Sequence, residues 1–216
     1  MSKMNLPNKL SLIRLCLVPV ILIVGMLTPK YSVTAPSVAF YVSSIVCAVL
    51  FIAAAVTDML DGRIARRQGL VTDFGKFIDP IADKFMVIGA LFVILFKFEN
   101  LEYIMIAALI IIVFRELAIT SIRLVASKSS NVVLAADMLG KIKTVTQIVA
   151  ISSAFLEPVL QWLVKLIAEN INGGVVYWRY DIMPITWLSI ALSLVMTVWS
   201  GINYLRAYWK YLDPEK

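Results

Sequence analysis

The chain contains no histidine and only two cysteines, and it has few charged residues. The two cysteines, Cys16 and Cys47, lie inside apolar runs, so we expect neither a disulfide framework nor a cysteine-based metal motif. Without histidine, any general acid or base must be a carboxylate, a lysine, a tyrosine or a cysteine. No internal repeat or low-complexity segment is evident. These absences narrow the possible chemistry before any motif is considered.

Apolar residues dominate the composition of the chain. Hydrophobic residues make up 61% of the 216 residues, and charged residues make up 16%. This composition is too apolar for a soluble domain of the same length and indicates a polytopic membrane protein. We therefore expect one all-α membrane domain over residues 1–216. The net charge of +6 need not indicate nucleic-acid binding, and we expect no nucleic-acid partner, since basic residues in a membrane protein bias its orientation and attract anionic lipid or phosphorylated substrates.

Six charge-free runs predict a bundle of six transmembrane helices. They cover residues 15–29, 35–56, 85–96, 103–114, 144–156 and 182–205. Four of these runs are shorter than the roughly 20 residues that cross a bilayer core, so their helices must extend into charged residues. We expect the third helix to extend back through Asp83 and Asp79. The fourth should run past Arg115 towards Arg123, and the fifth should extend back through Lys141.

The N-terminal segment, residues 1–14, carries Lys3, Lys9 and Arg14 ahead of an apolar run. No small-residue cleavage site closes that run, so we do not interpret the segment as a cleaved signal peptide. Pro7 and Asn8 are instead expected to open a short interfacial helix that leads into the first span. This helix is either a membrane-surface anchor or a contact for substrate.

The stretch 58–83 contains four carboxylates in the pattern Asp-x2-Asp-Gly-x2-Ala-Arg-x8-Gly-x3-Asp-x3-Asp. On helices, Asp58 and Asp61 are i and i+3 neighbours, and Asp79 and Asp83 are i and i+4 neighbours, so each pair shares a helix face. A short turn that contains glycine can bring the two faces together. Four acids that converge repel one another unless cations lie between them. Because the ligands are all oxygens, the pattern favours Mg2+ or Mn2+.

An Asp-rich solvated turn between helices is the alternative interpretation of this stretch. Isolated charges at membrane depth are costly and usually functional, which favours a metal site. Two divalent cations held by carboxylates can clamp a diphosphate during an in-line displacement. Gly62 and Ala65 would leave room for a nucleotide beside the helix backbone, and Arg66 could contact phosphate.

The pattern resembles, at all eight fixed positions, the signature of the CDP-alcohol phosphotransferase family of integral membrane enzymes. These positions are Asp58, Asp61, Gly62, Ala65, Arg66, Gly75, Asp79 and Asp83. The resemblance implies a homodimer and a CDP-linked lipid as substrate, bound near Gly62, Ala65, Arg66 and Gly75. It implies that Asp58, Asp61 and Asp79 ligate two metal ions. It also implies that Asp83 lies at the metals and is the base that deprotonates the acceptor alcohol.

Basic residues suggest a second anion site, for an acceptor that carries a phosphate. Arg115 and Arg123 are eight residues apart and share a helix face, and Lys141 opens the next helix. The segments 115–123 and 140–147 resemble the bacterial branch of the family in which sn-glycerol 3-phosphate reacts with CDP-diacylglycerol to give phosphatidylglycerophosphate and CMP. Some of these basic residues could instead only set membrane orientation, and for Arg123 and Lys143 the two interpretations are evenly balanced.

The distribution of basic residues predicts the orientation. With the N-terminus in the cytoplasm, 16 of the 20 lysines and arginines fall in cytoplasmic segments and 4 in external segments. The positive-inside rule therefore predicts that both termini and the active site face the cytoplasm, here of a bacterial cytoplasmic membrane.

Other functions stay open at this point. The same chemistry could serve another acceptor, such as inositol phosphate, serine or a phospholipid. Membrane prenyltransferases also use Asp-rich metal sites, although Gly62, Ala65, Arg66 and Gly75 fit the CDP motif better. From a different class, a divalent-cation transporter would also place carboxylates among membrane helices, and metal uptake without any CDP-lipid would identify it.

Overall fold

Six long helices make up the chain, and no strand occurs in the residues that the computed structural model describes, 5–31, 37–68, 72–130, 138–172 and 182–209. The helices are α1 (Leu6–Leu27), α2 (Val38–Gln68), α3 (Asp73–Lys97), α4 (Glu102–Ser130), α5 (Met138–Asn172) and α6 (Pro184–Tyr208). A 3-10 turn, η1 (Glu99–Leu101), leads into α4. The prediction of an all-α protein is confirmed.

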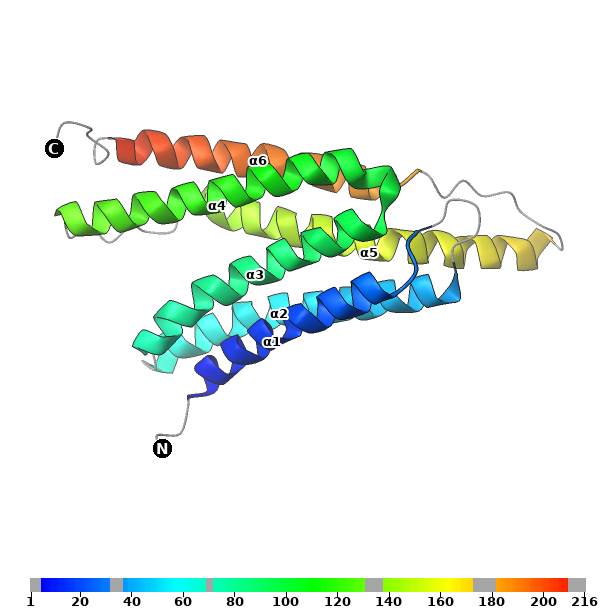
Figure 1. Ribbon diagram of the computed structural model, residues 1–216, viewed down its shortest axis with the longest axis horizontal. Coiled ribbons are helices and arrows are strands. Elements are labelled where there is room, and N and C mark those ends of the chain that lie inside the picture. Colours follow the sequence, from blue (N-terminus) through cyan, green and yellow to red (C-terminus); the bar gives the residue numbers. More distant parts are fainter. Residues whose placement is uncertain (1–4, 32–36, 69–71, 131–137, 173–181, 210–216) are drawn as a thin grey trace.

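Successive helices run in opposite directions along the long axis of the molecule (Figure 1). The starts of α1, α3 and α5 therefore lie at the same end as the ends of α2, α4 and α6. We call this the motif end, because the stretch 58–83 joins α2 to α3 there. The other end, where α1 ends and α6 begins, is called the opposite end.

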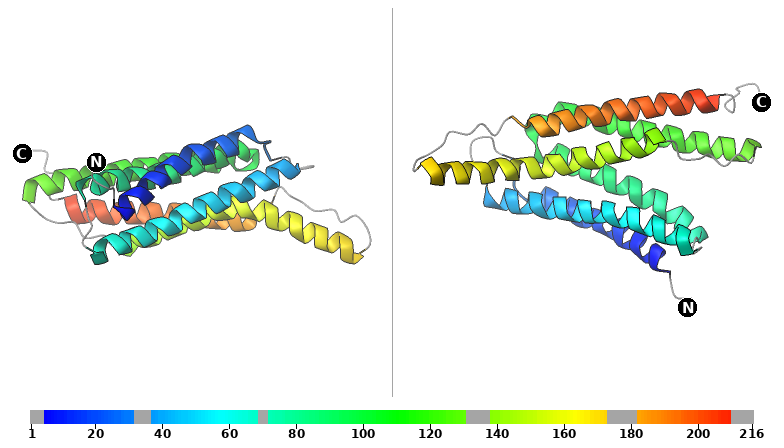
Figure 2. Two further views of the ribbon diagram at one scale, coloured as in Figure 1. Left: turned by 90° about the horizontal axis from the view of Figure 1, so that it is seen from below. Right: turned by 180° about the vertical axis from the view of Figure 1, so that it is seen from behind.

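The helices form two groups of three (Figure 2). In the first group, α1 packs against α2 and α3; in the second, α6 packs against α4 and α5. Contacts of α2 with α5, and of α3 with α4 and α5, join the groups, whereas within the described residues no Cα atom of α6 lies within 8 Å of one in α1, α2 or α3. The helices α3, α4 and α5 therefore bring the motif next to the basic residues of the second group.

The helices extend through charged residues, as the short charge-free runs predict. Helix α3 begins at Asp73, α4 continues to Ser130 and α5 begins at Met138. The side chain of Lys143, near the start of α5, is buried, so the extension carries a charge into the bundle and not into lipid.

Five helices are long and apolar enough to cross a membrane, namely α1, α2, α4, α5 and α6, among the described residues. Helix α3 differs because its first half carries Asp79, Asp83 and Lys84. Helix α1 runs without a break from Leu6 to Leu27, so no short interfacial helix is separated from the first span. That part of the prediction, and the count of six spans, are not confirmed.

Small residues allow α1 and α3 to pack closely. A β-carbon on Gly25 of α1 would lie 2.2 Å from Cγ1 of Val93, and one on Gly89 of α3 would lie 2.7 Å from Cγ1 of Val18. Real β-carbon contacts are not this short, so a side chain at either glycine would push the helices apart. This packing holds the middle and the end of α1 against the second half of α3.

Candidate functional site

The start of α3 is fixed by a helix cap. The hydroxyl of Thr72 accepts a hydrogen bond from the backbone N–H of Gly75 at 3.0 Å, which satisfies one of the free donors of the first turn. Asp79 and Asp83 follow one helical turn apart, and Asp58 lies near the end of α2. The side chains of residues 60–68 lie outside the described part of the chain, and with them the sites predicted at Asp61, Gly62, Ala65 and Arg66.

A polar stripe on α1 lies against the motif. Its members, Asn8, Ser11 and Arg14, follow one another at intervals of three residues and share one helix face. All three are buried, Arg14 and Ser11 being only 1% exposed. The hydroxyl of Thr72 donates to Oδ1 of Asn8 at 3.0 Å, and the same oxygen would lie 2.8 Å from a β-carbon on Gly75. Gly75 therefore permits the close approach of α1 to the start of α3.

Two side chains of this stripe bind carboxylates of the motif. The hydroxyl of Ser11 donates to Oδ1 of Asp79, and Nη1 of Arg14 forms an ion pair with Oδ1 of Asp58. The two partners of the ion pair differ in exposure, since the side chain of Arg14 is 1% exposed and that of Asp58 is 43% exposed. One helix thus contacts the carboxylates of both α2 and α3.

Asp83 lines a small cavity that it shares with charged groups of α4 and α5. Glu116 of α4 and Lys143 of α5 line the same cavity, and their side chains form an ion pair. Oε1 of Glu116 also accepts a hydrogen bond from Nη1 of Arg115 at 3.1 Å. The cavity therefore brings the predicted base together with the half-buried carboxylate of Glu116 and with Lys143, and Glu116 connects it to Arg115.

The two arginines of α4 contact α6. Nη2 of Arg115 donates to the hydroxyl of Ser200 at 2.6 Å, and Nη2 of Arg123 donates to the hydroxyl of Tyr204 at 2.8 Å. Their guanidinium carbons lie 5.9 Å and 5.3 Å from the centre of the Tyr204 ring, within the range of a cation–π interaction. Lys141 is exposed in the first turn of α5. Arg115 and Arg123 lie on α4 and Lys141 on α5. Of these three residues, only Arg115 has a described contact, through Glu116, with the cavity beside Asp83.

The donor set of the motif fits a hard divalent cation, since every candidate ligand is a carboxylate oxygen. Within the described side chains, no three acidic or sulfur-containing groups gather closely enough to hold an ion. Asp58 and Asp79 are bound by Arg14 and Ser11 in this arrangement. The chemistry of the ligands therefore suits Mg2+ or Mn2+, and the ligand set itself stays a prediction.

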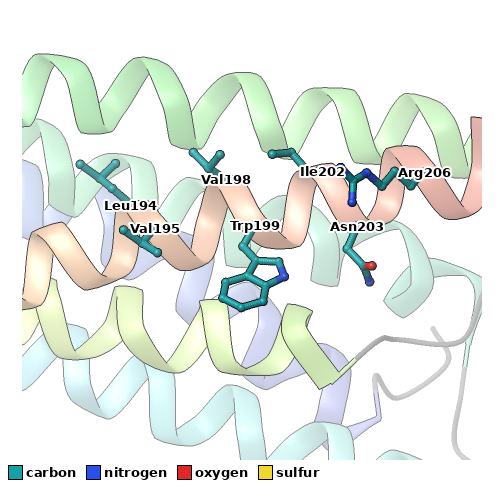
Figure 3. Close-up of a pocket in the computed structure, with 7 residues that line it drawn as sticks. All are labelled: Leu194, Val195, Val198, Trp199, Ile202, Asn203 and Arg206. Carbon is teal, nitrogen blue, oxygen red and sulfur yellow. The ribbon is translucent and has the colours of Figure 1, made fainter.

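A larger groove lies elsewhere, along the outer face of α6 (Figure 3). Its volume is about 590 Å3, and the residues of α6 that line it are Leu194, Val195, Val198, Trp199, Ile202, Asn203 and Arg206. The side chains of Val195 and Trp199 are more than half exposed. An exposed apolar face on a membrane helix suits contact with lipid, and the groove includes no residue of the motif.

Four side chains at the site are not assigned by the sequence. The N-terminal segment is a candidate for substrate contact, but nothing in the sequence pairs Ser11 or Arg14 with the motif. The sequence does not single out Glu116, and for Lys143 it favours a site and an orientation role equally. The sequence signal for Glu116 is its position at membrane depth. It lies in an apolar helix beside Arg115, and a carboxylate in that position requires partners within the bundle.

Comparison with known proteins gives consistent matches over nearly the whole chain. Residues 4–199 match the model of the family described as CDP-alcohol phosphatidyltransferase. A Bacillus subtilis (strain 168) protein is 39% identical over 212 residues, which are 96% of this chain and 97% of that protein. A Rickettsia felis protein is 32% identical over 213 residues, again 96% of this chain and 97% of that protein. Both are named CDP-diacylglycerol--glycerol-3-phosphate 3-phosphatidyltransferase.

Proposed function

This chain belongs to the CDP-alcohol phosphatidyltransferase family, and we propose that it transfers the phosphatidyl group of CDP-diacylglycerol to sn-glycerol 3-phosphate. A hydroxyl oxygen of the acceptor attacks the lipid-linked phosphorus, and the bond from that phosphorus to the CMP oxygen breaks. The products are phosphatidylglycerophosphate and CMP. The names of the two relatives and the motif at residues 58–83 support this reaction.

The motif residues take the roles that the family implies. The four aspartates, Asp58, Asp61, Asp79 and Asp83, would hold two divalent cations, Mg2+ or Mn2+, which when bound neutralise the diphosphate and make its phosphorus more electrophilic. Asp83 accepts the proton of the acceptor hydroxyl. The nucleotide lies along Gly62 and Ala65, with Arg66 on its phosphate and Gly75 leaving room at the start of α3.

The observation that carries the acceptor assignment is the shared cavity of Asp83, Glu116 and Lys143. A base and a phosphate-binding cation must lie within a few ångströms of each other if they act on the two ends of one small molecule. Glu116 holds Lys143 beside Asp83 and also contacts Arg115. Arg115, Arg123 and Lys141 remain the proposed contacts of the acceptor phosphate, and Lys143 joins them.

The membrane arrangement is part of the same proposal. Helix α3 is the sixth span, with its charged half facing the bundle interior, and the first turns of α1 lie at the interface. Both termini and the motif end face the cytoplasm, as the 16 to 4 division of basic residues favours. The protein forms a homodimer, as the family resemblance implies.

The test is CMP release by the purified protein in detergent with CDP-diacylglycerol and Mg2+. We expect release with sn-glycerol 3-phosphate and none with inositol phosphate, inositol or serine. CMP release with another acceptor would be consistent with the family but would change the proposed acceptor and product. No release with any acceptor, together with metal uptake by proteoliposomes that lack CDP-lipid, would favour the transporter.

A further inference from the structure

We propose that Tyr204 of α6 is a positioning residue that holds the guanidinium groups of Arg115 and Arg123 together, so that both can bind the phosphate of one acceptor molecule. The inference rests on the proposed function and deepens it, because it names the group that places the two arginines. The observations that carry it are two hydrogen bonds and two ring contacts between α4 and α6.

The spacing of the contacts brings the two arginine side chains together. Helices α4 and α6 pack against each other and run in the same direction (Figure 1). Arg115 and Arg123 are eight residues apart, which is about 12 Å along α4. Their hydrogen-bond acceptors, Ser200 and Tyr204, are four residues apart, which is about 6 Å along α6. The side chains therefore converge on one turn of α6.

The ring of Tyr204 is shared by the two guanidinium groups. The guanidinium carbon of Arg115 lies 5.9 Å from the ring centre, and that of Arg123 lies 5.3 Å from it. A cation near an aromatic ring is attracted by the negative face of the ring. Tyr204 is only 2% exposed, so the packing of the bundle fixes its ring. One rigid side chain thus restrains two long ones.

The two arginines depend on Tyr204 to different degrees. Arg115 also donates to Ser200 and to Glu116, and a β-carbon on Gly201 would lie 3.4 Å from Cγ of Arg115, so its stem lies against the backbone of α6. Arg123 is exposed, and its guanidinium donates to the Tyr204 hydroxyl at 2.8 Å. Loss of the hydroxyl should therefore act through Arg123.

Positioning of this kind should favour binding of the acceptor. An arginine side chain loses much rotamer freedom when it binds an anion, and contacts that restrain it beforehand reduce that loss. Two guanidinium groups that converge can both donate to the oxygens of one phosphate. Because Arg115 is connected through Glu116 to the cavity beside Asp83, a phosphate held there would lie at a fixed place relative to the proposed base.

The test measures CMP release by the full-length protein in detergent while either substrate is varied. Tyr204→Phe keeps the ring and removes the hydroxyl, and it should raise the KM for sn-glycerol 3-phosphate about fivefold, within the effect of one hydrogen bond. Tyr204→Leu also removes the ring contacts and should raise this KM about 20-fold. The KM for CDP-diacylglycerol should change by less than about twofold in both variants.

Ser189→Ala is the matched control for the loss of a buried hydroxyl from α6. Ser189 is buried, its hydroxyl lies 2.7 Å from that of Ser153 on α5, and it lies eleven residues before Ser200, about 16 Å along the helix. Both KM values should stay unchanged in this variant. Equal increases of the two KM values in Tyr204→Phe, or the same increase in Ser189→Ala, would show a merely structural role and overturn the inference.

A double-mutant cycle tests whether the hydroxyl acts through Arg123. If it does, adding Tyr204→Phe to Arg123→Gln should change the KM for sn-glycerol 3-phosphate by less than about twofold, because the contact is already lost. A further fivefold increase in the double variant would contradict the inference. Tyr204→Phe keeps the volume of the ring, so the cycle does not depend on whether Tyr204→Leu folds.

The restraint on Arg123 can also be measured without turnover. Phenylglyoxal modifies accessible arginine side chains, and mass spectrometry follows each site. In the absence of substrates, Tyr204→Phe should raise the modification rate of Arg123 severalfold, while Arg206, exposed near the end of the same helix, should react at its original rate. An unchanged rate at Arg123 would overturn the inference.

The inference and the proposed function fail in different ways. If the unaltered protein releases CMP with sn-glycerol 3-phosphate but Tyr204→Phe keeps the original KM for it, only the positioning role is wrong. If the unaltered protein releases CMP with no acceptor, the proposed function is wrong, and the inference falls with it.

Discussion

The two ends of the bundle both bury ionisable side chains, but they do so differently. At the opposite end, Lys97 is fully buried and donates to the hydroxyls of Thr28 at 2.7 Å and Ser43 at 2.6 Å. There the carboxylate of Glu157, 3% exposed, accepts from the backbone N–H groups of Ile185 at 3.1 Å and Thr186 at 2.7 Å. These contacts tie α1, α2 and α3 together and cap the start of α6.

At the motif end, the cation Arg14 is buried, whereas its carboxylate partner Asp58 is partly accessible. Arg14 is 1% exposed, while its partner Asp58 is 43% exposed, and Asp79 is also exposed. A carboxylate that is enclosed by donors, such as Glu157, has no remaining side for a ligand. A charge inside a membrane bundle can serve structure or chemistry, and we expect the exposure of the carboxylate to distinguish the two.

The largest expected effect is at the predicted base. Asp83→Asn should lower kcat by about 100-fold or more, within the range ascribed to general bases, because the amide cannot accept the acceptor proton. CDP-lipid binding and the midpoint of thermal unfolding should change little. CMP release and a CDP-lipid binding assay on the same preparation measure both, and unaltered turnover would remove Asp83 as the base.

The second largest effect distinguishes binding of the acceptor from binding of the CDP-lipid donor. Arg115→Ala should raise the KM for sn-glycerol 3-phosphate by about 30-fold, which corresponds to one charge-assisted contact of about 2 kcal/mol, and should hardly change the KM for CDP-diacylglycerol. Lys165→Gln, which removes a cation paired with Glu169 on α5, is the control for net charge. Equal increases in both KM values would argue against an acceptor-phosphate pocket.

At the opposite end the expected effect is on stability. Glu157→Leu removes the acceptor of two backbone N–H groups, of which that of Thr186 is buried, and should lower the free energy of unfolding by about 2 kcal/mol. Glu157→Gln keeps one acceptor oxygen and should lose less. Unfolding in denaturant gives the stability, and CMP release per folded molecule should stay the same. A large loss of turnover in a folded Glu157 variant would show that the opposite end also contributes to catalysis.

The smallest effect is expected at Lys97. Lys97→Met replaces a buried cation with an apolar chain of similar length, a change that is often close to neutral. The hydroxyls left behind keep other partners, since Thr28 also donates to the carbonyl of Val24 and Ser43 to that of Phe40, each at 2.8 Å. The unfolding free energy should change by less than about 1 kcal/mol, with KM and kcat unchanged. A loss of several kcal/mol would show that the ammonium itself holds this end together.

Much of the architecture could be predicted from local pattern. Four of the six charge-free runs are too short to span a bilayer, so length alone requires helices that pass through Asp83, Arg115 and Lys143. The family can be recognised from eight residues at fixed spacings in the sequence, and this pattern does not depend on how the helices pack. The interfacial helix was harder to predict, because Pro7 is compatible with a separate helix and also with the first turn of a long one.

The partners of the charged residues could not be predicted in the same way. Lys141 and Lys143 are two residues apart and therefore lie on different faces of α5, and only the packing of α5 on α3 and α4 decides which one is buried. Lys143 is the one that reaches Glu116, while Lys141 is exposed. The role of Lys141 at the acceptor phosphate stays a prediction.

Composition, run length and residue spacing are properties of the chain alone, and they suffice to predict the membrane class, the helical course and the family. The pairing of Arg14 with Asp58, 44 positions away, and the cap that Glu157 forms on α6 depend instead on how the helices pack. A buried charge must find an opposite charge or a hydrogen-bond partner, and packing selects the helix that supplies it.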